Sequence, residues 1–533
     1  QLLECPPRPY QHLGSVVEAT AARFPNRPAI WFQGEVTTWK ELNGLADRIA
    51  TVLYQKGVRS GGVVGLYATN RPETLALVTG CAKLGAVTAL LNTAQRGTTL
   101  EHSLAAAHVE LCFVENELKN AFGKNASESF EGLIKDAQTV SNPAPPDTQV
   151  SRNQPAFYIF TSGTTGLPKA SIMSHRRWMK AAYGYGFGML SLRAEDVVYN
   201  PLPLYHNLAQ TIAWGSCAAT GACLALAPKF SASRFWDDCR ASSATVITYI
   251  GEIPRYLLAQ APTPGDRMHS VRIATGVGLR TAVWDDFKVR FGIDHIGEFY
   301  GSSEGNTVFL NLLGLDHTVG ISPTPHVLVE WDATRQCPCR NAQGRLIPVK
   351  RGEPGLLLSR ITKRFPYDGY TDAGATEKRI YHNPFGKNRT YMDSGDLLKK
   401  VGYGHSIFID RVGDTFRWKG ENVATAEVEA VLNRFPGVRE STVYGISRPN
   451  IDGKPGMAAI ACDPDSLDIS GLYSHCRADL PEYAVPMYLR LQMTLQHTGT
   501  FKHERYALRE LALQPCPDSR LLGRNGDHAW AFL

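Results

Sequence analysis

The feature of this sequence that most constrains its fold is an alternation of short apolar runs with amphipathic segments. Apolar runs rich in β-branched residues lie at positions 63–67, 87–91, 111–114 and 245–250. Runs of this length are typical of strands buried on both faces of a sheet. Such strands, alternating with amphipathic helices, build βα units and mainly parallel sheets. We therefore predict the α/β fold class.

Two segments near the N-terminus carry the periodicity of amphipathic helices. Apolar residues recur at spacings of three and four in residues 13–24 and 39–53. The predicted buried faces are Val16, Val17, Ala19 and Ala22 in the first segment, and Leu42, Ala46, Ile49 and Leu53 in the second.

The length of the chain sets the expected number of domains. At 533 residues it exceeds what one ordinary hydrophobic core supports, so two or more domains are expected. An apolar strand at 406–409 is followed by a helix pattern at 425–432 and a strand pattern at 441–445. We predict a large domain over residues 1–410 and a small α/β domain over residues 411–533. The Pro-rich stretch 141–147 is predicted to be a linker or surface loop.

Composition narrows the class of protein. The sequence is 43% hydrophobic and 20% charged, as expected for a soluble globular protein. Its net charge of +6 favours anions only mildly and gives no reason to expect a nucleic acid partner. No signal-peptide pattern is found. The most apolar stretches, 74–91 and 211–227, are interrupted by Lys83 and by glycines, which predicts buried helix and strand rather than membrane spans.

The eleven cysteines are an odd number and are scattered along the chain. The one close pair, Cys337 and Cys339, has no second pair or histidine at the spacing of a zinc site. We expect reduced, mostly buried thiols, which fits a cytoplasmic location.

The first motif with chemical content is a phosphate-binding loop. A short apolar strand at 158–160 runs directly into Thr161–Lys169, whose sequence is Thr-Ser-Gly-Thr-Thr-Gly-Leu-Pro-Lys. Hydroxyl groups and backbone N–H groups donate to phosphate oxygens, glycines allow close approach, and Lys169 adds a positive charge. The loop is not a Walker A motif, because Pro168 precedes the lysine where that motif has glycine. Taken alone, the loop also fits a surface turn.

Five further short motifs accompany this loop. They are residues 276–280 (Gly-Val-Gly-Leu-Arg), 300–306 (Tyr-Gly-Ser-Ser-Glu-Gly-Asn), 394–396 (Ser-Gly-Asp), 410–411 (Asp-Arg) and 498–502 (Thr-Gly-Thr-Phe-Lys). Each alone fits a turn, a surface ion pair or a solvated lysine. Together and in this order they resemble the adenylate-forming superfamily, which contains acyl-CoA synthetases, luciferases and the adenylation domains of peptide synthetases.

The resemblance implies a role for each motif. An aromatic ring at Tyr300 would stack on adenine, and the carboxylate of Glu304 would help to hold Mg²⁺. Asp396 and Arg411 would contact the ribose, and Lys502 would stabilise charge on the α-phosphate. The implied nucleotide-binding residues are Thr161, Ser162, Gly163, Thr164, Thr165, Gly166, Lys169, Gly276, Gly278, Tyr300, Gly301, Ser303, Asp396 and Arg411. The implied catalytic residues are Lys502, Glu304, His206 and Lys169.

A narrower resemblance covers nearly the whole chain. Residues 408–429, 249–252, 298–300 with 304–306, 368–370 and 498–502 are similar to the fatty acid transport protein and very-long-chain acyl-CoA synthetase family. That family has Thr-Gly-Thr-Phe-Lys near its end, which accounts for the two residues between Gly499 and Lys502. The resemblance implies a large domain of sheets flanked by helices and a small mobile C-terminal domain.

The implied reaction has two half-reactions. A fatty acid and Mg-ATP give an acyl-adenylate and pyrophosphate, and the thiol of coenzyme A then displaces AMP. In related enzymes the small domain rotates between these steps, so we expect a hinge at Gly413, where glycine tolerates large φ/ψ changes. Lys502 would serve the first step, and the loop of Lys419, Gly420, Glu421 and Asn422 would serve the second. The acyl pocket would include His206, Tyr249, Ile250 and Gly251.

Several alternatives remain open at this point. The acyl group could pass to a carrier protein instead of coenzyme A, or the acid could be a bile acid or another steroid acid. The chain could act in vectorial uptake of fatty acids, with esterification trapping the acid, or it could only bind its ligands. Chain-length preference, peripheral contact with a membrane face and assembly into a dimer are also open.

Overall fold

The computed structural model describes residues 11–143, 145–146, 148–162, 167–332, 335–412, 414–418, 421–448, 454–497, 505–524 and 530–533. The chain divides into two compact units. Unit 1 consists of Gln1–Leu279, Asp285–Asp316 and Pro366–Lys378, and unit 2 of Arg280–Trp284, His317–Phe365 and Arg379–Leu533. The predicted boundary between residues 410 and 411 remains a prediction.

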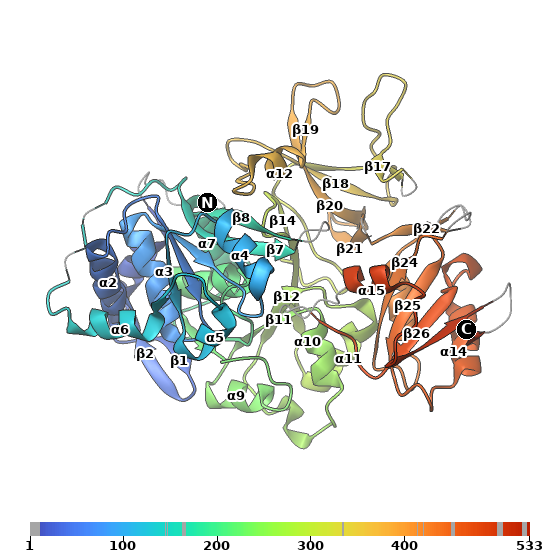
Figure 1. The fold of residues 1–533 in the computed structure, drawn as a ribbon, viewed down its shortest axis with the longest axis horizontal. Helices are drawn as coiled ribbons and strands as arrows, with labels where there is room; N and C mark the ends of the chain where they lie inside the picture. The colour runs from blue at the N-terminus through green and yellow to red at the C-terminus, as the bar shows by residue number, and fades with distance from the viewer. Residues whose placement is uncertain are drawn as a thin grey trace. The chain divides into compact units, whose positions relative to one another are not determined.

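Among its described residues, unit 1 contains two large sheets (Figure 1). The first has the order β14 (Val308–Leu310), β13 (His295–Gly301), β12 (Ile273–Val277), β11 (Val246–Ile250), β9 (Val197–Asn200), β10 (Cys223–Leu226), β1 (Pro28–Phe32) and β2 (Glu35–Thr38). The second has the order β6 (Glu128–Ser129), β5 (Leu111–Val114), β3 (Val63–Tyr67), β4 (Val87–Leu90), β7 (Pro155–Ser162) and β8 (Pro168–Ser174). Among the strand pairs described in this unit, β1–β2, β13–β14 and β7–β8 are the antiparallel ones. The prediction of mainly parallel sheets is confirmed for this unit.

Helices cover these sheets and fill the space beside them. They are α1 (Leu13–Arg23), α2 (Trp39–Gln55), α3 (Pro72–Leu84), α4 (Gly97–Ala106), η1 (Asn116–Leu118), α5 (Lys119–Phe122), α6 (Phe130–Thr139), α7 (His175–Tyr183), the π-helices η2 (Gly184–Met189) and η3 (Leu208–Ala213), α8 (Trp214–Thr220), α9 (Phe235–Ala241), α10 (Glu252–Leu258), η4 (Pro264–Arg267) and α12 (Ala373–Glu377). Helix α11 (Thr281–Phe291) begins in unit 2 and belongs to unit 1 from Asp285 onward. Helix α1 packs against α2, α3 and α8. Residues 74–91 and 211–227 form buried helix and strand, as predicted.

Local sequence explains why α2 forms where it does. At its start the backbone N–H of Glu41 donates to the Thr38 hydroxyl at 3.2 Å, and the Thr38 N–H donates to the Glu41 carboxylate at 2.8 Å. This reciprocal capping box satisfies N–H groups that the first turn leaves free. All four residues of its predicted buried face are buried. In α1 the prediction was wrong in part, because Ala19 and Ala22 are exposed. Thr20 and Ala21, a turn after Val16 and Val17, are buried there instead.

The described part of unit 2 is mainly antiparallel. One sheet runs β15 (His326–Val329), β18 (Pro354–Arg360), β20 (Thr390–Lys400) and β19 (Ile380–His382), with β21 (Ser406–Arg411) also paired to β20. Another runs β24 (Glu440–Gly445), β25 (Gly456–Ala461), β26 (Tyr488–Gln492), β27 (Ser519–Gly523) and β28 (Ala531–Phe532). The small ribbons are β16 (Trp331–Asp332) with β17 (Cys337–Pro338), and β22 (Phe416–Trp418) with β23 (Glu421–Val423). The helices are α13 (Thr425–Leu432), α14 (Ile469–Asp479), η5 (Glu482–Ala484) and α15 (Arg505–Leu511).

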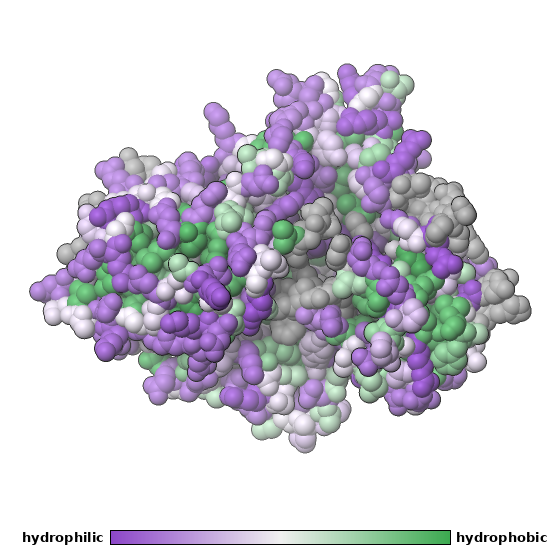
Figure 2. All heavy atoms as spheres, in the orientation of Figure 1, coloured by the Kyte–Doolittle hydropathy of each residue, from purple (hydrophilic) through white to green (hydrophobic). Residues whose placement is uncertain are grey.

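The polarity of the surface and the burial of the cysteines agree with the expectations from composition. Polar and charged side chains cover most of the face shown in Figure 2, and the apolar areas on it are separate. In the portion of the chain that the structure describes, no helix is both long enough and apolar enough to cross a bilayer. Of the ten cysteines described, seven are buried, and Cys337 is exposed. The prediction of mostly buried thiols is confirmed for these residues.

Candidate functional site

The two ends of the phosphate-loop motif lie on the paired strands β7 and β8 of unit 1, which we call the phosphate hairpin. Strands β7 and β8 pair antiparallel, with Thr161 opposite Lys169 and Ser162 opposite Pro168. The loop residues Gly163, Thr164, Thr165 and Gly166, and the side chain of Ser162, lie outside the described residues. The Lys169 ammonium lies 5.6 Å from the centre of the Tyr370 ring, a distance at which the cation is attracted to the ring face.

A segment from much later in the sequence holds β8 in place. The N–H of Ile172 donates to the carbonyl of Gly369, and the N–H of Thr371 donates to the carbonyl of Ala170, both at 3.0 Å. Beside them, the Asp368 carboxylate accepts a hydrogen bond from the Ser174 hydroxyl at 2.6 Å. Asp368-Gly369-Tyr370 thus acts as an added edge along β8.

The same strand and the helix after it hold the predicted adenine and magnesium loop. The Ser171 hydroxyl donates to the carbonyl of Ser303 at 2.9 Å, and the Arg177 guanidinium donates to the carbonyl of Ser302 at 3.0 Å. The loss of solvent around Arg177 lowers the pKa of its guanidinium, while the charges of Asp368 and Glu304 oppose that shift. Arg177 does not belong to any motif in the sequence, so sequence analysis did not identify it.

The residues predicted for adenine and Mg²⁺ lie at the end of β13. Tyr300 is buried and meets Phe309 of β14 edge-on, with ring centres 5.7 Å apart. Glu304 follows in the loop and is partly exposed. Within the described residues, no group of three or more histidine, cysteine or acidic side chains could hold a metal ion. One carboxylate at Glu304 nevertheless fits Mg²⁺ that arrives on ATP, because such a cation takes its other ligands from phosphates and water.

The glycine motif at 276–278 lies between the predicted acyl and adenine residues. Gly276 pairs with Tyr249 of β11 on one side and with Glu298 of β13 on the other. A Cβ at position 276 would lie 2.2 Å from the Tyr249 carbonyl oxygen, so no side chain fits there. Gly278 has φ +85°, a conformation that favours glycine.

The residues predicted for the acyl pocket come from two places in unit 1. Tyr249 and Ile250 are buried at the end of β11, and the N–H of Gly251 donates to Val277 at 2.9 Å. His206 lies before the π-helix η3, and its Nδ1 accepts a hydrogen bond from the Leu208 N–H at 3.2 Å. That bond places the ring proton of the neutral imidazole on Nε2.

The buried side chain of Asn70 fixes the backbone just before His206. Its amide donates to the carbonyls of Leu202 and Ala227 at 2.9 Å, and its carbonyl oxygen accepts from the Leu204 N–H at 2.8 Å. Sequence reasoning did not identify Asn70.

In unit 2 the two predicted ribose contacts are neighbours. Asp396 on β20 lies opposite Arg411 on β21, with 3.7 Å between the Asp396 carboxylate and the Arg411 guanidinium. Asp396 is 7% exposed, and its N–H donates to the Ser394 hydroxyl at 3.1 Å. A pair this long, with the arginine side chain 47% exposed, contributes little to stability by itself.

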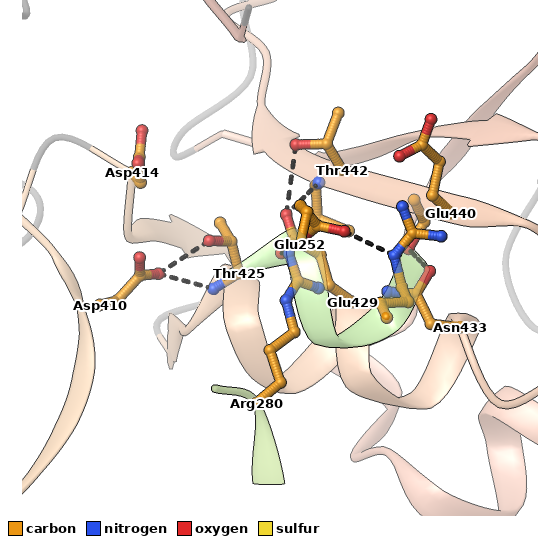
Figure 3. A network of polar contacts seen from close by, with 12 residues as sticks. Glu252, Arg280, Asp410, Asp414, Thr425, Glu429, Asn433, Glu440 and Thr442 are labelled. Atoms are coloured by element: carbon orange, nitrogen blue, oxygen red, sulfur yellow. Dashed lines mark hydrogen bonds and ion pairs between the residues drawn. The ribbon is translucent and has the colours of Figure 1, made fainter. Parts of the chain in front are cut away.

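A polar cluster in unit 2 adjoins the predicted hinge in the sequence. The buried Asp410 carboxylate accepts hydrogen bonds from the N–H and hydroxyl of Thr425 at 2.8 and 2.9 Å (Figure 3). Burial raises the pKa of Asp410 to about 6. Burial would also raise the pKa of Asp414, but the adjacent Arg505 and Arg509 lower it below its usual value.

Arg505 is the centre of this cluster. Its guanidinium contacts the Asp414 carboxylate at 2.5 Å, the Glu429 carboxylate at 2.6 Å and the Thr442 hydroxyl at 2.9 Å. Arg505 begins α15, three residues beyond Lys502 in the sequence. It therefore holds the start of that helix against α13 and β24.

Several predicted residues cannot be placed. Lys502, the hinge residue Gly413, and Lys419 and Gly420 of the coenzyme A loop lie outside the described residues. Glu421 and Asn422 of that loop begin β23, opposite Trp418 and Arg417, but their side chains are not described.

Comparisons with known proteins agree with the geometry. A family model described as AMP-binding enzyme matches residues 17–354, and one described as AMP-binding enzyme C-terminal domain matches residues 427–502. The medium/long-chain-fatty-acid–CoA ligase FadD6 of Mycobacterium tuberculosis is 43% identical over 513 residues, covering 94% of this chain and 86% of that protein. Long-chain fatty acid transport protein 1 of Rattus norvegicus is 38% identical over 532 residues, covering 94% of this chain and 82% of that protein.

Among solved structures, ATP-bound MatB from Rhodopseudomonas palustris matches with a TM-score of 0.81 at 20% identity. The match covers 95% of this chain and 99% of that chain. The predicted α/β fold of the adenylate-forming enzymes is thereby confirmed.

Proposed function

Because this chain belongs to the AMP-binding enzyme family, we propose that it is an ATP-dependent fatty acyl-CoA synthetase acting on medium, long or very long chains. The fatty acid carboxylate attacks the α-phosphorus of ATP, and pyrophosphate leaves. The thiol of coenzyme A then attacks the acyl carbon, and AMP leaves. Two relatives are named as a fatty-acid–CoA ligase and a fatty acid transport protein. These names support a fatty acid as the substrate.

The observation that carries this proposal is the attachment of the Ser302–Glu304 loop to the phosphate hairpin. Ser171 on β8 and Arg177 on α7 both donate to backbone carbonyls of that loop. The loop that carries Glu304 is thereby connected to β8, which carries Lys169, and such a connection supports the orientation of a polyphosphate.

Each site residue then has a role in the proposed reaction. Lys169 and the loop before it hold the departing pyrophosphate, and Tyr300 packs against adenine. Glu304 would hold Mg²⁺, which when bound would neutralise charge on the phosphates. Asp396 and Arg411 contact the ribose hydroxyls, since a buried carboxylate is a strong acceptor for a pair of hydroxyls.

The remaining roles belong to the small domain and the acyl wall. We propose that residues 411–533 form the mobile domain, that Gly413 is its hinge, and that Lys502 stabilises the α-phosphate charge of the first step. Lys419, Gly420, Glu421 and Asn422 serve the thiol step. His206, Tyr249, Ile250 and Gly251 line the acyl pocket, which needs mostly apolar walls.

Location, assembly and competing substrates complete the proposal. We place the enzyme in the cytoplasm, with peripheral membrane contact and a dimer as options that fractionation and size-exclusion measurements distinguish. A bile-acid or steroid-acid CoA ligase, and a vectorial uptake protein that traps fatty acid as its CoA ester, are the alternative functions.

The test is a panel of acids from hexanoate to lignocerate, together with a steroid acid, assayed for pyrophosphate release and for AMP release with and without coenzyme A. We expect pyrophosphate release to depend on a fatty acid, and coenzyme A to accelerate AMP release. Faster pyrophosphate release with the steroid acid would support the alternative ligase. AMP release at the same rate with and without coenzyme A would contradict the thiol step.

A variant pair sharpens this test. Removing the ammonium of Lys502 by Lys502→Ala should lower pyrophosphate release by about a hundredfold or more. Lys454→Ala, at an exposed lysine of the same unit, should match the wild type. A Lys502→Ala protein as fast as the wild type would contradict the proposed mechanism.

A further inference from the structure

A buried carboxylate, Glu298, lies between the predicted acyl wall and the predicted adenine wall. It occupies the middle of β13, where its neighbours in the strand are apolar, and it is 3% exposed. None of the roles given above uses it. A charged side chain in this position is costly unless its hydrogen bonds are satisfied.

One oxygen of Glu298 reaches the acyl wall. Tyr249, Gly276 and Glu298 lie in one row across the parallel strands β11, β12 and β13. Because Gly276 has no side chain, the Tyr249 ring can pass over β12, and its hydroxyl donates a short hydrogen bond to Glu298 Oε2. A Cβ at position 276 would lie 2.5 Å from Cδ2 of that ring.

The other oxygen of Glu298 reaches the turn that follows β12. Glu298 Oε1 accepts hydrogen bonds from the N–H of Gly278 at 2.5 Å and from the N–H of Leu279 at 3.1 Å. These N–H groups belong to the segment predicted to line the adenine. The two oxygens of one carboxylate therefore hold two different walls.

In the described part of the chain, these three hydrogen bonds are the polar contacts of the Glu298 carboxyl group. Among the described residues no cation pairs with it, and burial raises the pKa of its carboxyl to about 8 although all three hydrogen bonds oppose that shift. An acid buried in this environment costs folding free energy. Such acids are found more often where the group has a functional role than where it only fills the core.

We propose that Glu298 is a positioning residue that couples the two substrate pockets. A fatty acid that packs against Tyr249 moves the carboxylate, and the carboxylate moves the Gly278–Leu279 turn against the nucleotide. Each substrate then binds better in the presence of the other, because coupling between two sites is reciprocal. This inference rests on the proposed function, in which Tyr249 lines the acyl pocket and the 276–278 motif lines the adenine.

The first experiment measures binding alone. Calorimetry with AMP, in the presence and absence of saturating palmitate, should give about fivefold tighter AMP binding with palmitate present. Tyr249→Phe removes only the hydroxyl that donates to Glu298, so it should abolish this difference. Equal coupling in Tyr249→Phe and wild type would overturn the proposal, as would a wild type with no coupling.

The second experiment separates positioning from folding. Glu298→Ala should raise the KM values for both ATP and palmitate about tenfold, since two walls lose their hydrogen-bond acceptor. Glu298→Gln should restore both values to within about threefold, because an amide oxygen still accepts from Gly278 and Leu279, and its NH₂ can donate to the Tyr249 oxygen. A change in kcat only, or in one KM only, would contradict a coupling role.

A matched variant controls for the loss of a buried acid. Glu115 is also buried in unit 1, and it accepts a hydrogen bond from the Thr69 N–H at 2.7 Å. Glu115→Ala should lower thermal stability and leave both KM values unchanged. If Glu298→Ala does not fold, the Tyr249→Phe binding experiment and the Glu298→Gln KM values still decide the matter.

The outcome is distinguishable from failure of the proposed function. If the wild type releases no pyrophosphate with any acid, the synthetase proposal fails. The AMP and palmitate binding experiment needs no turnover, so it tests the coupling in either case.

Discussion

The Ser171 hydroxyl donates a hydrogen bond of 2.9 Å to the carbonyl of Ser303, 132 residues further along the chain. It joins the phosphate hairpin directly to the loop that carries Glu304. Substituting Ser171 with alanine leaves that part-buried carbonyl without this donor, which costs about 1 kcal/mol. We expect Ser171→Ala to raise the KM for ATP about fivefold, measured by pyrophosphate release, with the KM for palmitate unchanged.

Ser103→Ala is the matched control for this change. Ser103 is also buried in unit 1, but its hydroxyl donates only to Thr99 within its own helix. An equal rise in the KM for ATP in both variants would show that the effect comes from general destabilisation.

Gly276 should tolerate no side chain. Gly276→Ala places a Cβ 2.2 Å from the Tyr249 carbonyl oxygen, and relief requires the strands β11 and β12 to separate. We expect a loss of at least about 3 kcal/mol in the free energy of unfolding and loss of adenylation.

Gly44→Ala, on the partly exposed face of α2, meets nothing closer than the Arg48 side chain at 3.6 Å. It should instead add about 0.5–1 kcal/mol, because alanine favours helix over glycine. Urea unfolding compares the two, and a Gly276→Ala protein as stable as the wild type would refute the packing argument.

Substitution of Asp396 should change the KM for ATP and not the KM for the fatty acid. Asp396→Asn keeps the shape of the side chain and removes its charge, so hydroxyl donors lose a charged acceptor worth about 1.5–3 kcal/mol. We expect the KM for ATP to rise at least tenfold and the KM for palmitate to stay within twofold. A larger change in the palmitate value would place Asp396 elsewhere in the reaction.

Arg505 should be more important for stability than any exposed arginine of unit 2. Arg505→Ala leaves the carboxylates of Asp414 and Glu429, both mostly buried, without this partner. We expect a loss of about 3 kcal/mol in the free energy of unfolding. Arg520→Ala breaks a pair with Asp465 whose side chains are 45% and 72% exposed, and it should cost less than about 1 kcal/mol. Similar losses in the two variants would show that the cluster is solvated in solution.

Acid should destabilise unit 1 through two histidines in contact. Burial lowers the pKa of His12 to about 4 and that of His175 to about 3, and their ring centres are 5.6 Å apart. Both rings are neutral in the folded protein, whereas an unfolded histidine takes up a proton near pH 6.5. Stability linked to them is fully present above pH 6.5 and is lost as the pH falls toward 4.

The measurement is the melting temperature between pH 5 and 7, where few unfolded carboxyl groups titrate. His175→Gln can still accept the hydrogen bond that the Leu13 N–H now donates at 3.3 Å to the ring, and it should reduce the slope. His108→Asn, at an exposed residue with φ 52°, should leave the slope unchanged. An unaltered slope in His175→Gln would contradict the assignment.

Sequence patterns predicted several elements that have an apolar run or an apolar face. The strands at 63–67 and 111–114 and the helix at 425–432 have the predicted bounds, since every strand residue there is buried or nearly so. Strand β7 is longer than the predicted 158–160, because its pairing with β8 extends it from Pro155 to Ser162. The antiparallel sheet of β15, β18, β20, β19 and β21 was not predicted, because its strands come from distant parts of the chain and only pairing defines them.

The candidate site residues proposed from the sequence all belong to motifs, whereas residues that act through packing and backbone contacts were missed. Tyr300, Gly276 and Asp396 stand in recognisable motifs, whereas Arg177 and Asn70 act on backbone carbonyls and have no such signal. Glu298 does carry a sequence signal, because it is an acidic residue that interrupts the apolar strand His295–Gly301. Its role depends on the register of three strands, which the sequence does not state.

The row of Tyr249, Gly276 and Glu298 also limits how such an enzyme can diversify. The nearest atom to a Cβ at position 276 is a main-chain oxygen, so no replacement of the Tyr249 ring would make room for a side chain there. Position 276 is therefore fixed whatever acid the enzyme uses. Positions 249 and 298 meet only through side-chain atoms. Natural variation that reshapes this wall should therefore change those two residues together, as a covarying pair on either side of an invariant glycine.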